Sequence, residues 1–274
     1  MYQVLDGKIV VSKEDFDSRH ILLCGQIFSY EEKQDCFVVY SKDKKAEIFE
    51  KSTCYEIITK DPKYFETFFD LQTNYGKIKT TLSQFEILKK PIEYGNGIRI
   101  LKNDKFEILI SFIISANNNI KRIQKIINCL KEKCGKKMSG YYAFPTREEM
   151  LALTEEDFAK LGAGYRAKYL FNVLRQVDEK QLEEWDKLET KELRVKLVGL
   201  FGVGPKVADC ILLFGYYRQE VFPVDTWIEQ SYNKFVDSEE HNRQKIRENL
   251  IKMFGNLSGY AQQYLFFYQR SFIG

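Results

Sequence analysis

The spacing of apolar and polar residues changes character along the 274-residue chain. Between residues 8 and 60, short apolar runs alternate with charged or turn-forming residues, which is typical of an antiparallel sheet with one covered face. The runs are Ile9–Val11, His20–Cys24, Cys36–Tyr40, Ala46–Phe49 and Tyr55–Thr59. From Leu101 onward apolar residues recur at helical spacing, so helices should dominate there. The pattern predicts an α+β fold, with an N-terminal antiparallel sheet domain over residues 1–97 and an all-helical core over residues 98–274.

The segment that joins the two parts carries signals for one helix and one loop. Asp61 and Pro62 are typical of a helix start, and the helix should continue through Phe69. The stretch from Pro91 to Gly97 contains turn-forming residues and predicts a loop. We therefore expect the domain boundary near Gly97.

A tight turn between two apolar helical runs stands out within the expected helical core. One helix ends just before Gly202, and the next has its body from Val207 to Phe214. Gly202 and Gly204 give the connection the backbone freedom that it needs. Pro205 suits the first turn of the second helix, because its missing N–H would be unpaired there anyway. The pattern predicts a helix-hairpin-helix over about residues 194–217.

Such a turn directs free backbone N–H groups outward from a helix N-terminus, here those of Gly202, Gly204 and Val207. They can hold a phosphate oxygen without reading any base, so a nucleic acid is the expected partner. The net charge is 42 − 39 = +3, which alone would not indicate that partner. A local cluster of cations supports it, although a solvated helix face would explain part of the cluster. Its members are Lys121, Arg122, Lys125, Lys131, Lys133, Lys136 and Lys137.

Two side chains near this turn have the chemistry of a covalent catalyst. Lys206 lies in the first turn of the second helix, and Asp225 precedes a helical run from Thr226 to Phe235. A lysine near the positive end of a helix should have a lowered pKa, and its neutral amine would then be a nucleophile. Asp225 can orient that amine, transfer its protons and stabilise positive charge on a sugar. Taken singly, Asp225 is equally well a helix cap and Lys206 a phosphate contact.

The cysteines and the apolar runs exclude several classes of protein. Six cysteines form no CxxC pair, and the only histidines are His20 and His241, so neither a zinc site nor a disulfide framework is expected. No run of 18 apolar residues and no signal sequence is seen. We therefore expect a cytoplasmic protein of bacterial type that has no cofactor, no metal and no membrane partner.

The motifs GVGPKVADC and FPVDTW resemble those of the helix-hairpin-helix DNA glycosylases, and most closely those of the 8-oxoguanine DNA glycosylases. The resemblance extends from Gly25 to Phe266. It implies that Lys206 attacks the anomeric carbon of a damaged nucleotide with help from Asp225. A Schiff base and elimination of the 3′-phosphate would follow, so the resemblance implies both glycosylase and lyase activity. The implied partner is double-stranded DNA that contains 8-oxoguanine, and we expect the protein to act as a monomer.

The same resemblance assigns a base pocket to four residues. In the segment LLCGQIF, the carbonyl of Gly25 would accept the N7–H of 8-oxoguanine. Guanine has an acceptor at N7, so this one carbonyl could distinguish the lesion from the normal base. Gln262 would read the Watson–Crick edge, while Cys210 and Phe266 would cover the two faces of the base. From the residues alone, the favoured interpretation of Gly25 is a bend in a strand, and that of Phe266 is a core aromatic.

Two further segments are implied to contact the DNA around an extruded nucleotide. In FIISANNNI, Asn117 would enter the space that the nucleotide leaves, and Arg122 would contact the orphaned base. In GAGYR, Tyr165 would buckle the opposite strand, and Arg166 would read the estranged cytosine. Without the resemblance, the asparagines read as helix capping, and GAGYR reads as a loop before a helix over residues 167–177.

The chain departs from the eukaryotic relatives at three places. Trp227 stands where they have a phosphate-contacting histidine, and Gln269 stands where they have an acidic residue, so DNA binding and pH dependence are expected to differ. Pro205 stands where they often have threonine. Two other functions stay open. A glycosylase for another damaged purine of the adenine or alkyl-purine type is disfavoured, because such enzymes lack the lysine. A non-catalytic DNA-binding module is disfavoured by Asp225 and the implied base pocket.

Overall fold

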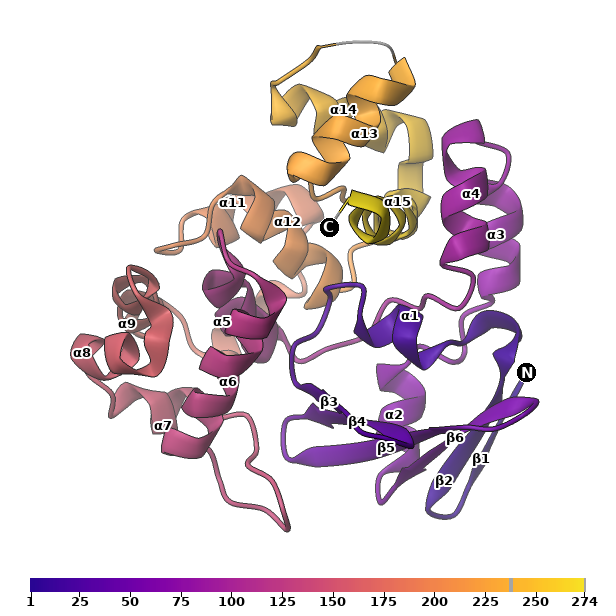
Figure 1. Cartoon of the computed structure of the whole chain (residues 1–274). Coiled ribbons are helices and arrows are strands. Elements are labelled where there is room, and N and C mark those ends of the chain that lie inside the picture. The colour runs from indigo at the N-terminus through magenta and orange to yellow at the C-terminus, as the bar shows by residue number, and fades with distance from the viewer. Residues whose placement is uncertain (237–238, 274) are drawn as a thin grey trace.

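The computed structural model describes residues 1–236 and 239–273, and it divides them between one sheet and a larger set of helices (Figure 1). All neighbouring strands are antiparallel, in the order β1-β2-β6-β5-β4-β3. The strands are β1 (Tyr2–Leu5), β2 (Lys8–Ser12), β3 (Tyr30–Glu32), β4 (Cys36–Ser41), β5 (Lys44–Glu50) and β6 (Cys54–Thr59). The expected α+β fold with an N-terminal antiparallel sheet is confirmed.

One of the expected strands is wrong, because part of the run His20–Cys24 is helical. Residues Ser18–Leu22 form the short helix α1. The Asp17 carboxylate caps this helix by accepting the His20 backbone N–H at 3.0 Å. In a strand, the His20 N–H would bond to a neighbouring strand. Here the Asp17 side chain accepts it instead, and this local hydrogen bond favours a helix in an apolar run whose pattern fits either structure. The chain then turns at Gly25.

The sheet has an apolar core of its own, which is rich in aromatic side chains. Helix α2 (Pro62–Phe68) and the residue after it supply Phe65, Phe68 and Phe69 to this core. Phe16 packs edge-on against Phe69, with ring centroids 5.5 Å apart. Burial of one such ring contributes about 1.5–3 kcal/mol, and edge-to-face pairing adds to it. The core therefore fixes α2 on the sheet.

The remaining chain is helical. Its helices are α3 (Tyr75–Leu82), α4 (Glu86–Tyr94), α5 (Lys105–Ser115), α6 (Ile120–Cys134), α7 (Arg147–Leu151), α8 (Glu155–Phe158), α9 (Arg166–Gln176), α10 (Glu179–Trp185), α11 (Thr190–Val198), α12 (Pro205–Phe214), α13 (Thr226–Val236), α14 (Arg243–Phe254) and α15 (Ser258–Ile273). Figure 1 shows the C-terminal helix α15 between α13 and α4, both of which it contacts. None of the helices within residues 1–236 and 239–273 combines the length and apolar character that a membrane crossing requires.

The two apolar cores do not separate at the boundary that we expect near Gly97. Helices α3 and α4 precede that point, yet Tyr75, Leu88 and Ile92 belong to the core of the helical part. The expected loop from Pro91 is also wrong in its first half, since Pro91 lies inside α4 and is buried. Leu88 and Ile92 are four residues apart and so share one helix face, and this packing outweighs the backbone bond that proline cannot make.

Gln26 ties the turn after α1 to the segment that leads into α5. Its side chain is fully buried, and Nε2 donates to the carbonyls of Ile21 at 3.0 Å and Arg99 at 2.7 Å. Its Oε1 accepts the Leu101 N–H at 2.8 Å. Because a buried amide with both ends satisfied is costly to displace, the backbone on either side of Gly25 is held against the helical core.

Candidate active site

The connection between α11 and α12 is the expected hairpin. Gly202 adopts φ +86, and a Cβ there would lie 2.6 Å from Tyr169 Cβ, so only glycine fits without displacement. In the part of the chain that the structure describes, the N–H groups of Gly202, Gly204 and Val207 have no backbone acceptor. Three free donors at the start of α12 make the turn suitable for a phosphate.

Lys206 projects from the first turn of α12 into a partly apolar setting. The residue is half-buried, and its Nζ lies 5.6 Å from the centroid of the Phe112 ring. It also shares a hydrogen bond with the sulfur of Cys210, which is one helical turn further along and buried. The amine is therefore held beside the residue that the resemblance assigns to the base pocket.

The neighbours of Lys206 decide its charge. Burial alone lowers the pKa of Lys206, but its charge interactions with Cys210 and Asp225 and the bond to the sulfur raise that pKa more, and the net direction is upward. The lowered pKa expected from the helix N-terminus is therefore wrong for the protein without DNA. Lys206 is an ammonium group here, and it must lose a proton before it can act as a nucleophile.

Asp225 begins α13 and has one carboxylate oxygen available. Oδ1 accepts the Ile228 N–H at 3.0 Å, and the Asp225 carbonyl accepts the Glu229 N–H at 3.0 Å. Asp225 therefore does cap α13. The second oxygen, Oδ2, has no hydrogen-bond partner within the described residues, and the carboxylate is near enough to raise the pKa of Lys206. One side chain can therefore cap the helix and face the amine.

The residues implied for base recognition come from three separate elements. Gly25 is in the turn after α1 with φ +81, and a Cβ on it would lie 3.2 Å from Cε1 of Phe266. Gln262 on α15 is 5% exposed, and its Oε1 has no hydrogen-bond partner in the described structure. A buried acceptor left unpaired costs about 1–3 kcal/mol, so this site is arranged for a donor that comes from outside the chain.

The asparagine triplet has the helix-capping role that its sequence leaves open, and Asn117 is left exposed beside it. Asn119 caps α6 by accepting the Arg122 N–H at 3.0 Å, and Asn118 donates to the Ile114 carbonyl at 3.1 Å. Asn117 is exposed in a left-handed conformation with φ +49, so its side chain is free to face a ligand. Arg122 is also exposed, and it reaches the Gly162 carbonyl at 3.3 Å.

Arg166 lies in a different setting from the one that its sequence indicates. Its side chain is 3% exposed, and Nε donates to the Ala116 carbonyl at 2.8 Å while Nη2 donates to Asn117 at 2.7 Å. Most of its donors are therefore used to hold the turn at Asn117. Its neighbour Tyr165 is 54% exposed and donates from its hydroxyl to Ala116 at 3.1 Å, so it is the more accessible of the two.

The basic cluster is mostly, but not entirely, on the surface. Lys131 is 5% exposed, and its Nζ lies 4.4 Å from the centroid of the Tyr40 ring. It therefore packs inside the protein, and the prediction that groups it with the surface cations is wrong. The exposed members are Lys121, Arg122, Lys125, Lys133, Lys136 and Lys137.

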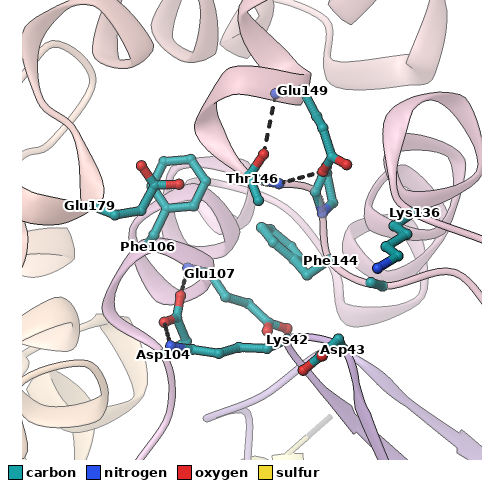
Figure 2. Close-up of a pocket in the computed structure, with 12 residues that line it drawn as sticks. Lys42, Asp43, Asp104, Phe106, Glu107, Lys136, Phe144, Thr146, Glu149 and Glu179 are labelled. Atoms are coloured by element: carbon teal, nitrogen blue, oxygen red, sulfur yellow. Dashed lines mark hydrogen bonds and ion pairs between the residues drawn. The ribbon is translucent and has the colours of Figure 1, made fainter.

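A hollow of about 350 Å³ lies where the β4–β5 turn meets α5 and α7, and Lys136 is among its lining residues (Figure 2). Several of its polar groups satisfy one another. Asp104 accepts the Glu107 N–H at 2.9 Å and pairs with Lys42 at 3.0 Å, and Thr146 and Glu149 form a capping box. Figure 2 shows these pairs around the hollow. The hollow lies between the sheet and the helices, and neither Lys206 nor Asp225 lines it.

No sequence signal marks one ion-pair group that holds the hairpin. Asp209, three residues after Lys206, is 2% exposed and is paired with Arg194 of α11 and Arg247 of α14, each at 2.8 Å. These contacts fasten both hairpin helices to α14. The arginines are 15 and 38 residues away in the sequence, so spacing alone could not indicate the group.

Two family models match the chain. The N-terminal domain of 8-oxoguanine DNA glycosylase matches residues 8–109, and the HhH-GPD superfamily base excision DNA repair protein matches residues 110–255. The chain is 27% identical to the N-glycosylase/DNA lyase of Saccharomyces cerevisiae, with 95% of this chain and 85% of the relative covered. It is 30% identical to a probable N-glycosylase/DNA lyase of Methanothermobacter thermautotrophicus, with 75% and 73% covered.

A solved structure agrees over nearly the whole chain. The 8-oxoguanine glycosylase/lyase of Clostridium acetobutylicum, in complex with dsDNA containing cytosine opposite to 8-oxoG, superposes with a TM-score of 0.93 at 38% identity. The match covers 99% of this chain and 98% of that one. The chain therefore belongs to the 8-oxoguanine DNA glycosylase family of the HhH-GPD superfamily, and it is a DNA glycosylase with lyase activity.

Proposed function

We propose that this protein extrudes 8-oxoguanine from duplex DNA, excises it, and cleaves the strand at the resulting abasic site. The observation that carries the proposal is the setting of Lys206. Its amine stands at the start of the hairpin's second helix, bonded to Cys210 and close to the Asp225 carboxylate. A lysine that only neutralised a phosphate would not need a partly buried position between these two groups.

In this proposal Lys206 attacks C1′ of the extruded nucleotide as a free amine. The free oxygen of Asp225 takes the proton that the ammonium must lose and passes it to solvent, and the regenerated carboxylate stabilises the positive charge that grows at C1′. The amine nitrogen bonds to C1′ while the C1′–N9 bond breaks, and its electron pair leaves with the base. Opening of the sugar ring gives a Schiff base. Loss of a proton from C2′ then expels the 3′-phosphate.

Recognition of the base rests on Gly25, Gln262, Cys210 and Phe266. The Gly25 carbonyl would accept N7–H, which 8-oxoguanine has and guanine lacks. The unpaired Oε1 of Gln262 would accept a donor from the Watson–Crick edge, and the base would lie between Cys210 and the Phe266 ring. Truncation of Gln262 to alanine should raise the dissociation constant for lesion DNA more than that for abasic DNA. Equal increases would refute this assignment.

The DNA would be gripped without reading its sequence. The free N–H groups of Gly202, Gly204 and Val207 would hold a phosphate, and exposed Asn117, Arg122 and Tyr165 would occupy and flank the gap left by the base. Arg166 would act at the orphaned cytosine only through the turn that it supports. One chain supplies both the lysine and the base pocket, which supports action as a monomer.

The test separates base removal from strand cleavage. A duplex with one 8-oxoguanine opposite cytosine is incubated with the protein, and half of each sample is treated with hot alkali, which cleaves every abasic site. Lys206→Gln should abolish both signals. Asp225→Asn should slow base removal at least about a hundredfold. Lys89→Gln, at an exposed lysine paired with Glu86, is the matched control and should keep both signals. Base removal at the normal rate by Lys206→Gln would contradict the proposal.

A further inference from the structure

We propose that Gln263 and Arg270 are positioning residues for lesion recognition. They hold Leu23 and Cys24 against α15, so that the Gly25 carbonyl keeps a fixed place relative to the Phe266 ring. The inference rests on the proposed function and adds two residues that the sequence motifs do not mark.

Gln263 contacts Cys24, the residue before Gly25. It follows Gln262 on α15, but its side chain points elsewhere, because successive residues on a helix are turned by about 100°. It is 1% exposed, and Nε2 donates to Cys24 Sγ at 3.1 Å and lies 3.4 Å from the Cys24 carbonyl oxygen. Gln26 reaches the same sulfur at 3.2 Å from the other side. Two buried amides therefore converge on Cys24.

Arg270 contacts the same turn from two helical turns further along α15. Residues seven apart lie on one helix face, so Gln263 and Arg270 form one stripe along the turn. Arg270 Nη2 donates to the Leu23 carbonyl, and its Cζ lies 5.3 Å from the centroid of the Phe266 ring. Its Nη1 would lie 3.1 Å from a Cβ on residue 25. The guanidinium thus touches the turn and the ring that together define the pocket.

The contacts matter because of the backbone conformation at Gly25. With φ +81, this glycine occupies a region that it can leave at little cost, so its own dihedral preferences do not fix the direction of its carbonyl. A hydrogen bond weakens steeply when donor and acceptor are misaligned. The direction must therefore be set by the neighbours, and on the N-terminal side these are Leu23 and Cys24. Removing the contacts of Gln263 and Arg270 with Cys24 and Leu23 should therefore impair recognition of the base by the Gly25 carbonyl. It should not affect cleavage of an abasic site, which does not use that carbonyl.

The test compares two substrates of one enzyme. Gln263→Met keeps the side-chain volume and removes the donor, and Arg270→Lys keeps a single charge that can still reach Leu23. Single-turnover excision is measured on 8-oxoguanine opposite cytosine, and strand cleavage on a duplex with a preformed abasic site. Gln263→Met should slow excision about tenfold while abasic cleavage stays within about twofold. Arg270→Lys should fall between the wild type and Gln263→Met.

A second experiment measures binding of the lesion in a protein that cannot excise it. In a Lys206→Gln background, the ratio of affinities for duplexes containing 8-oxoguanine and guanine should fall about tenfold when Gln263→Met is added. Gln84→Leu, at an exposed glutamine in the turn between α3 and α4, should leave that ratio unchanged. Thermal unfolding of each variant shows whether it is folded. If Gln263→Met does not fold, the Arg270→Lys variant alone tests the positioning role.

The outcomes separate this inference from the function on which it rests. Equal losses on both substrates, or an unchanged affinity ratio, would overturn the positioning role. A wild-type protein that cleaves the abasic duplex but leaves 8-oxoguanine intact would instead overturn the proposed substrate.

Discussion

Replacing Glu107 by glutamine should remove a pH-dependent weakness at the junction of the sheet and the helices. Glu107 lies in the first turn of α5 and is 6% exposed. Its Oε1 accepts the Ser29 hydroxyl at 2.6 Å, it also accepts the Lys42 backbone N–H, and Lys131 is close by. Burial nevertheless dominates and raises the pKa of Glu107 from 4.5 to about 7. Figure 2 shows the Glu107 side chain extending from α5 toward Lys42 and Asp43 of the β4–β5 turn.

The sign and size follow from proton linkage. Between pH 4.5 and pH 7 the folded protein keeps a proton on Glu107 that the unfolded chain has lost, so stability falls as the pH rises through this window. A rise from 4.5 to about 7, at about 1.36 kcal/mol per pKa unit, corresponds to about 3 kcal/mol lost by pH 8.5. Glutamine resembles the protonated acid at every pH and should not show this loss.

The assay is urea unfolding of both proteins from pH 5 to pH 8.5. The free energy of unfolding of Glu107→Gln minus that of the wild type should increase by about 2–3 kcal/mol over this range, because part of the loss has already occurred at pH 5. Glu86→Gln, at an exposed carboxylate, should give a flat difference. A flat difference for Glu107→Gln as well would refute the reasoning.

Three further predictions concern the hairpin and the DNA face. Asp209→Ala leaves Arg194 and Arg247 unpaired and should lower the free energy of unfolding by about 3 kcal/mol, measured by urea titration; a loss below about 1 kcal/mol would contradict the pairing. Gly202→Ala must displace Tyr169 and should weaken binding to undamaged duplex about tenfold, whereas Gly140→Ala, at an exposed φ +85 glycine with open space around it, should not. Tyr165→Ala should keep stability within about 0.5 kcal/mol but slow single-turnover excision about tenfold; normal excision would exclude a wedge role.

The elements that carry strong local patterns could be predicted from the sequence. The glycines and proline of the hairpin define a turn through their own backbone preferences, and the apolar spacing of α5, α9, α12 and α13 identifies each helix. The placement of Lys206 and Asp225 at the starts of two helices could be predicted in the same way, because a Gly-Pro turn and an aspartate before a helical run are both signals of a helix N-terminus.

The sequence is less informative where particular hydrogen bonds and charge contacts decide the outcome. The run His20–Cys24 satisfies a strand pattern, but the Asp17 cap makes much of it helical. The charge of Lys206 depends on Cys210 and Asp225 more than on its helix. Nothing in the sequence indicates that Arg166 holds the turn at Asn117, because the carbonyls of Ala116 and Asn117 that accept its donors lie about fifty residues earlier. In each case a specific contact, local for Asp17 and long-range for Arg166, adds to or overrides the average preference of the residue type.

The supporting contacts around the pocket carry no local signal at all. Gln263 binds Cys24, and Arg270 binds Leu23, across 239 and 247 residues. A glutamine and an arginine on an aromatic helix look like ordinary surface residues, and only the fold shows that they face a buried turn.

The most direct measurement is borohydride trapping on a duplex with one 8-oxoguanine opposite cytosine. Reduction converts a Schiff base into a stable amine, so the protein and the DNA strand should become covalently joined, and peptide mass analysis should place the link on Lys206. No adduct should form with Lys206→Gln or with undamaged DNA, and Lys89→Gln should trap like the wild type. A wild-type protein that binds the lesion duplex but gives no adduct, or one that is linked through another residue, would contradict the assignment of Lys206 as the nucleophile.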